Sequence, residues 1–87
     1  MEIAFKPTGV RQENTWTLAY IDDSDETRTI VVSLSDLSAE RLMRQAPSQN
    51  EFWIADAVAR IASARTRSQD ENFEISDVEV DEFLANN

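Results

Sequence analysis

The chain has 87 residues, of which 17 are acidic and 8 are basic, so its formal net charge is −9, and it contains neither cysteine nor histidine. The lack of these two residue types excludes disulfides, thiolate or imidazole zinc sites, and the nucleophilic triads that use histidine. A hydrophobic fraction of 41%, with two Trp, four Phe and one Tyr, predicts a single small folded domain over residues 1–87.

Three strand patterns occupy the first part of the chain. Residues 2–6 predict a short strand, and Pro7 and Gly9 predict a turn after it. Residues 14–22 and 27–34 alternate between apolar and polar side chains, which predicts two half-buried strands joined by the charged loop DDSDE. The apolar faces of these two strands are formed by Trp16, Leu18, Tyr20, Ile30, Val32 and Leu34.

Two helical patterns follow. Residues 35–46 predict a helix with Ser38 as N-cap, which Pro47 closes. Residues 48–65 predict a second helix, begun by a capping box of Ser48 and Glu51. The apolar stripe of the second helix consists of Ile54, Ala55, Ala57, Val58, Ile61 and Ala62.

The end of the chain predicts a short strand and a short helix. The strand covers residues 71–76, and the helix follows a second capping box formed by Ser76 and Glu79. We therefore expect an α+β fold: a three-stranded antiparallel sheet, or β-meander, packed by two helices, with a short C-terminal strand-helix element.

No motif predicts catalysis. A single glycine cannot build a P-loop or a dinucleotide fingerprint, and the chain is short for enclosing a substrate. The loop DDSDE spaces Asp22, Ser24 and Glu26 as calcium ligands, yet Thr27 and Ser33 stand where an EF-hand needs glycine and glutamate. We expect a non-enzyme without cofactor or metal; carboxylate-bound Mg²⁺ is the one enzymatic alternative.

Five arginines lie between residues 41 and 67, where only Glu51 and Asp56 oppose them. One interpretation places them at a solvated helix C-terminus, where cations favour the helix dipole and pair with the acids that follow. The other is a phosphate-binding patch, which we disfavour because seven acids and no base occupy residues 68–87. These arginines are Arg41, Arg44, Arg60, Arg65 and Arg67, of which the last three are candidate partner-binding residues.

The acidic end also has two interpretations. It could be an ordinary solvated surface, which we favour, or an array that imitates the phosphates of a nucleic acid and inhibits a DNA- or RNA-processing protein. The array would consist of Glu74, Asp77, Glu79, Asp81 and Glu82, and the last four are candidate partner-binding residues.

Phe52 and Trp53 are the remaining candidates. Phe52 lies nearly opposite the apolar stripe of its helix, and Trp53 lies at the edge of that stripe. Either both pack under the preceding loop, which we favour, or one is exposed as a binding anchor.

Together these features predict a small acidic protein that binds a protein partner or a second copy of itself, as an adaptor, inhibitor or accessory factor of bacterial or phage type. A net charge of −9 disfavours direct nucleic-acid binding. No apolar run approaches the ~18 residues that a membrane span needs, and the first ten residues lack signal-peptide features. We therefore expect a cytoplasmic protein without membrane contact, a location that the absence of cysteine also fits.

Overall fold

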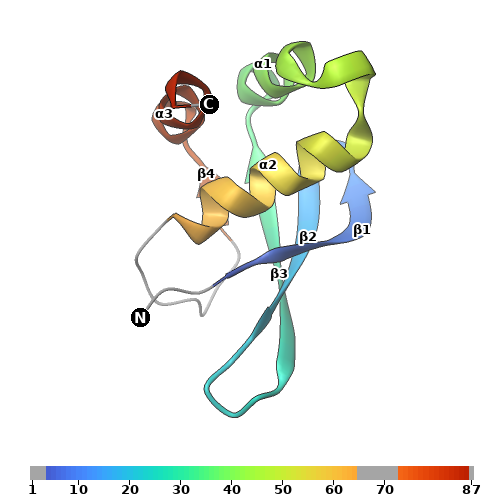
Figure 1. The fold of residues 1–87 in the computed structure, drawn as a ribbon, viewed down its shortest axis with the longest axis vertical. Coiled ribbons are helices and arrows are strands. Elements are labelled where there is room, and N and C mark those ends of the chain that lie inside the picture. Colours follow the sequence, from blue (N-terminus) through green and yellow to red (C-terminus); the bar gives the residue numbers. More distant parts are fainter. Residues whose placement is uncertain (1–3, 65–72, 87) are drawn as a thin grey trace.

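The computed structural model describes residues 4–64 and 73–86 of the chain. Helices lie over one face of a four-stranded sheet, and the β2–β3 hairpin extends beyond them (Figure 1). In chain order the elements are β1 (Lys6–Gln12), β2 (Thr15–Ile21), β3 (Thr27–Leu34), α1 (Asp36–Gln45), the 3₁₀ helix η1 (Pro47–Gln49), α2 (Glu51–Ser63), β4 (Phe73–Ile75) and α3 (Asp77–Ala85).

The sheet has the strand order β1-β2-β3-β4. β1, β2 and β3 form the expected antiparallel meander. The C-terminal strand and helix are present, but the prediction of a three-stranded, antiparallel sheet is wrong, because β4 pairs with β3 in parallel and adds a fourth strand. The physical reason is the crossover: α1 and α2 carry the chain back to the starting end of β3, so that β4 runs in the same direction.

The core lies between the sheet and the helices. All six residues of the predicted apolar faces of β2 and β3 are buried. The residues on the opposite face of these strands are half-buried in the part of the sheet that lies nearest the helices. α2 buries Ile54, Ala57, Val58 and Ile61 against them, and its alanines let the helix approach the sheet closely. Each large aliphatic side chain buried in this way stabilises the fold by roughly 1.5–3 kcal/mol.

β1 differs from its prediction. Ile3 lies outside the described residues, and Pro7 and Gly9 lie within β1 instead of forming a turn. Pro7 is opposite Leu18 and Arg11 is opposite Trp16, so a bulge of extra β1 residues lies between the two pairs. Gly9 has a φ of 88°, which only glycine adopts without strain, and the chain reverses later, at residues 13–14.

Two of the three predicted helix starts are wrong. α1 is capped by Ser35, whose hydroxyl accepts a hydrogen bond from the backbone N–H of Ser38, and Ser38 is itself a buried helical residue. α2 is capped by Asn50, because Ser48 has a φ of 54° inside η1. The third start is confirmed: Ser76 and Glu79 form the capping box of α3.

Candidate functional site

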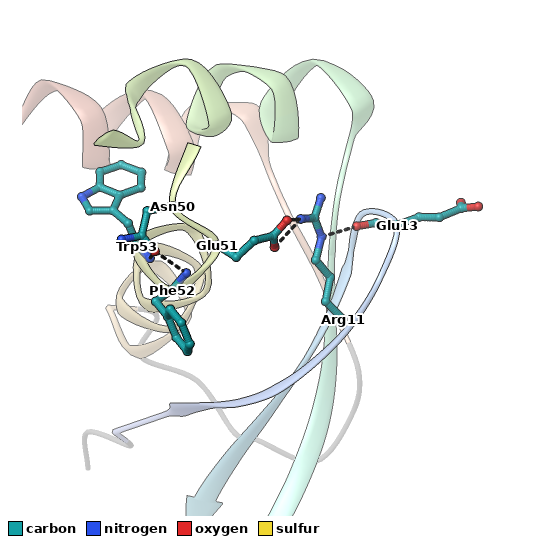
Figure 2. Close-up of polar contacts among 6 residues, drawn as sticks. All are labelled: Arg11, Glu13, Asn50, Glu51, Phe52 and Trp53. Atoms are coloured by element: carbon teal, nitrogen blue, oxygen red, sulfur yellow. Dashed lines mark hydrogen bonds and ion pairs between the residues drawn. The ribbon is translucent and has the colours of Figure 1, made fainter. Parts of the chain in front are cut away.

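The most distinctive surface lies where β1 meets the first turn of α2 (Figure 2). A groove of about 300 Å³ separates these two elements. Its walls are mainly apolar, and the only charged residues in its lining are one arginine and one glutamate. The lining consists of Pro7, Gly9, Val10, Arg11, Trp16, Thr17, Glu51, Phe52 and Ala55.

Phe52 stands at this groove as an exposed aromatic side chain. The Asn50 cap accepts hydrogen bonds from the backbone N–H groups of Phe52 and Trp53, at 2.9 and 3.4 Å, and so sets the start of the helix. With Ile54 turned into the core, the helical rotation of about 100° per residue directs Phe52 outward. Its exposed fraction is 83%, so the packing interpretation is wrong for Phe52.

Trp53 packs as expected, but against α3 and not under the preceding loop. It leaves α2 in a different direction from Phe52 (Figure 2) and is half-buried. Its ring meets that of Phe83 on α3 edge to face, with centroids 6.5 Å apart and an interplanar angle of 66°. Trp53 therefore joins α2 to α3, which leaves Phe52 as the exposed aromatic of this pair.

Arg11 forms the polar part of the groove. Its Nη1 donates to both carboxylate oxygens of Glu51, at 2.8 and 2.7 Å, and its Nε donates to the carbonyl of Glu13 at 2.8 Å (Figure 2). The guanidinium carbon lies 4.9 Å from the centre of the Trp16 ring, in cation–π geometry. These contacts hold the arginine side chain against the groove floor, where only 22% of it is exposed, and they neutralise the charge of Glu51.

Trp16 adds one unsatisfied group to this floor. Its side chain is buried, and its indole N–H has no hydrogen-bond partner among the described residues. The cation–π contact with Arg11 covers the ring face but supplies no acceptor to the N–H.

Val10 completes the apolar rim and was not among the predicted site residues. It is 59% exposed and belongs to the bulge of β1, where the hydroxyl of Thr8 accepts from the Val10 N–H at 3.2 Å and donates to the Thr17 carbonyl at 2.8 Å. The sequence did not indicate Val10 as a site residue, because the turn predicted at Pro7 and Gly9 ended the first strand before this position.

The predicted acidic array lies on α3 and β4, and three of its members, Asp77, Glu79 and Asp81, contact other parts of the chain. Asp77 accepts hydrogen bonds from the hydroxyls of Ser35, at 2.8 Å, and of the buried Ser38. These donors, the Ser38 hydroxyl first, lower the pKa of Asp77 below its ordinary value. Asp77 thus joins the start of α3 to the start of α1.

Two other members of the array also have partners within the chain. Glu79 accepts from the Ser76 backbone N–H at 3.1 Å in the capping box, and Asp81 forms an ion pair with Arg41. Glu82 is exposed and lines a second groove, of about 360 Å³, between α2 and α3. Glu74 is an exposed residue of β4.

The predicted arginine patch does not form among the described residues. Arg41 pairs with Asp81, Arg44 pairs with Glu40, and Arg60 pairs with Asp56 at 2.8 Å. Arg65 and Arg67 lie outside the described residues. The three described arginines are therefore neutralised by carboxylates, but only Arg41 pairs with an acid of the C-terminal segment, whereas Arg44 and Arg60 pair with acids one turn earlier in their own helices.

Two groups of acids among the described residues lie toward the two ends of the molecule. One group, in the loop between β2 and β3, lies at the tip of the hairpin, and the other lies on α1 and α3 at the opposite end of the 38 Å long axis (Figure 1). In the hairpin loop Asp22 accepts from the backbone N–H groups of Ser24 and Glu26, at 2.8 and 3.0 Å. The hydrogen bond that Arg28 donates to the Asp22 carboxylate is the largest cause that lowers the pKa of Asp22.

Among the described residues, no group of three or more acidic side chains is arranged to hold a metal ion. The described helices include none that combines the length and apolar character needed to cross a bilayer. Comparisons of the chain with protein-family models, with curated proteins and with solved structures found no match. The candidate site is therefore judged on its geometry alone.

Proposed function

We propose that this chain is a small non-catalytic protein-interaction module, of the adaptor, inhibitor or accessory-factor kind, and that it contacts its partner through the groove between β1 and α2. The observation that carries the proposal is the exposure of Phe52, at 83%, beside a groove of about 300 Å³. Exposed aromatic side chains beside an apolar hollow are typical of the residues that dominate binding energy at protein interfaces.

Size and charge support a protein ligand. The groove lies at the lower limit of small-molecule pockets, which measure about 300–1,000 Å³, so it suits one or two side chains of a partner better than a cofactor. The pairing of Glu51 with Arg11 and of Asp56 with Arg60 leaves the surface around Phe52 without an uncompensated acid on this stretch of α2. A neutral apolar centre with a polar border is the usual organisation of a binding interface.

Phe52→Ala tests the proposal. We expect it to weaken partner binding by roughly 30-fold or more, which corresponds to about 2 kcal/mol for an interface hot spot. The fold should be unaffected, because Phe52 is exposed and alanine has the highest helix propensity. The measurement is retention of proteins from a nuclease-treated lysate of the source cells, quantified by mass spectrometry, with wild-type and variant baits.

Leu37→Ala is the matched control, since Leu37 is also a large exposed apolar residue, 57% exposed, and lies in the first turn of α1. A partner retained by the wild type and by Leu37→Ala but lost by Phe52→Ala is the expected result. Equal retention by all three baits would reject the groove as the contact surface.

The alternative proposal, a nucleic-acid mimic, has less support because Asp77, Glu79 and Asp81 are engaged in contacts within the chain. The same experiment separates the two proposals. A mimic would retain a nucleic-acid enzyme at low salt and release it at high salt, whereas an apolar contact at Phe52 resists salt.

A further inference from the structure

The groove surface contains both a projecting aromatic side chain and a hollow next to it. Phe52 projects from it with 83% of its area exposed, and directly beside Phe52 lies a hollow of about 300 Å³ lined by Val10, Trp16 and Ala55. A surface that contains both a projecting side chain and a hollow large enough to receive one can pair with its own copy about a two-fold axis. We propose that the occupant of the groove is Phe52 of a second copy of this chain, in a dimer that exchanges the two side chains reciprocally.

The inference rests on the proposed function of this surface and names its partner. In a two-fold contact every interaction occurs twice, so each copy both donates its Phe52 and receives the other. A phenylalanine side chain buries about 150–250 Å² on such transfer, which makes it a suitable anchor for a small interface.

The charge distribution favours contact at this place over any other between two copies. Each copy carries a net charge of −9, and most of its described acids lie in the hairpin loop or on α1 and α3, toward the two ends of a 38 Å axis. The groove lies between these ends, where the acids of α2 are paired with Arg11 and Arg60. Two molecules that meet at their grooves bring these surfaces together and not their acid-rich ends, which limits the repulsion between the copies.

Analytical ultracentrifugation over a concentration series tests the proposal with four chains: wild type, Phe52→Ala, Ala55→Leu and Leu37→Ala. Phe52→Ala removes the projection, and Ala55→Leu fills the hollow, because Ala55 lines it and is half-buried. We expect the wild type and Leu37→Ala to dimerise, and each of the other two to raise the dissociation constant at least about 30-fold. Circular dichroism verifies that all four chains are folded.

Mixing the two disabled variants gives the decisive result. In an equimolar mixture, Phe52 of the Ala55→Leu chain can still enter the hollow of the Phe52→Ala chain, which loses the Phe52 wall but keeps those of Val10, Trp16 and Ala55. We expect heterodimers at concentrations where each variant alone is monomeric, a recovery that misfolding could not produce. We also expect added salt, from roughly 0.02 to 0.5 M, to strengthen the wild-type dimer by screening the repulsion between its acids.

A wild type that stays monomeric to about 1 mM, a Phe52→Ala chain that dimerises as well as the wild type, or a mixture without heterodimers would each overturn this inference. The lysate experiment then shows which proposal has failed. If Phe52→Ala still loses a captured protein there, only the self-association is rejected and the groove keeps its function. If nothing captured depends on Phe52, both proposals are rejected.

Discussion

Asp77 shows how a single side chain can join two elements that are distant in the sequence. Its Oδ1 accepts from Ser35, the cap of α1, and from Ser38, a helical residue that is fully buried. Both donors stabilise the charged carboxylate, and Arg41 nearby adds a smaller favourable charge, so the pKa of Asp77 lies below its usual 3.8. Its position in the first turn of α3 also suits the helix dipole.

We expect Asp77→Asn to lower the free energy of unfolding at pH 7, because the amide forms weaker hydrogen bonds with the two hydroxyls and carries no charge. A lowered pKa in the folded state means that the stabilisation is complete above the ordinary carboxyl pKa and is lost as the pH falls through the folded value. The difference in the free energy of unfolding between wild type and variant should therefore be constant near neutrality and shrink below about pH 4. Urea unfolding of both chains across pH 2.5–7 measures it.

Glu82→Gln is the control for this experiment, since it removes one negative charge from an exposed position of the same helix. It should change stability much less than Asp77→Asn at pH 7. A difference between wild type and Asp77→Asn that does not change with pH would contradict the role of the charge.

Phe52 illustrates what could be foreseen of the candidate site. Its position opposite the helical stripe made it a candidate anchor, but the sequence alone favoured packing under the preceding loop. The structure exposes it, because η1 and the Asn50 cap direct the preceding segment elsewhere. Val10 could not have been found, because its exposure depends on a bulge whose proline and glycine have the composition of a turn.

At the scale of elements, the caps determine where each helix begins. Asn50 starts α2 and the reciprocal pair of Ser76 and Glu79 starts α3, so that backbone N–H groups without partners inside the helix are satisfied. For a helix as short as α3, the hydrogen bonds of the cap contribute more to stability than intrinsic helix propensity does, because few residues of α3 are buried in the core.

We expect Ser76→Ala to destabilise the protein by about 1 kcal/mol, the usual cost of losing an N-cap side chain. Ser76→Asp keeps an acceptor at the cap and should recover most of this loss, although its charge lies near that of Glu79. Thermal unfolding monitored by circular dichroism compares the three chains. Equal stability of Ser76→Ala and wild type would mean that α3 is held by its tertiary contacts alone.

The sequence predicts well those elements whose pattern is local. β2 and β3 alternate over seven or more residues, and α2 carries a continuous stripe, so all three lie where their periodicity places them. Pairing between distant segments is not encoded in this way. The three residues of β4 contain too little pattern to indicate that they join β3, or in which direction, since that depends on how α1 and α2 pack.

At the scale of the whole molecule, the ion pairs do not balance the charge. The described arginines of α1 and α2 are paired with carboxylates, yet the chain still carries more than twice as many acids as bases. Exposed pairs contribute only about 0–1 kcal/mol each, so repulsion among the remaining acids is expected to dominate the electrostatic free energy of folding.

Sodium chloride should therefore stabilise the protein at pH 7. Raising its concentration from about 0.02 to 0.5 M screens the repulsion, and we expect the melting temperature to rise by roughly 4 °C or more, equivalent to about 1 kcal/mol. Differential scanning calorimetry of the Phe52→Ala chain makes the measurement without a contribution from dimerisation. A melting temperature that falls with salt would show that the ion pairs outweigh the repulsion.

The irregular course of β1 has a consequence for how copies of this chain can assemble. A regular strand at the edge of a sheet would be a template for adding further sheets without limit, and the product would be a fibre. In β1, however, Pro7 has no N–H to donate, Gly9 turns the backbone away from the strand conformation, and the bulge interrupts the register. These features oppose growth through this edge, so the proposed association through the side chains of the groove would give a closed pair and no larger assembly.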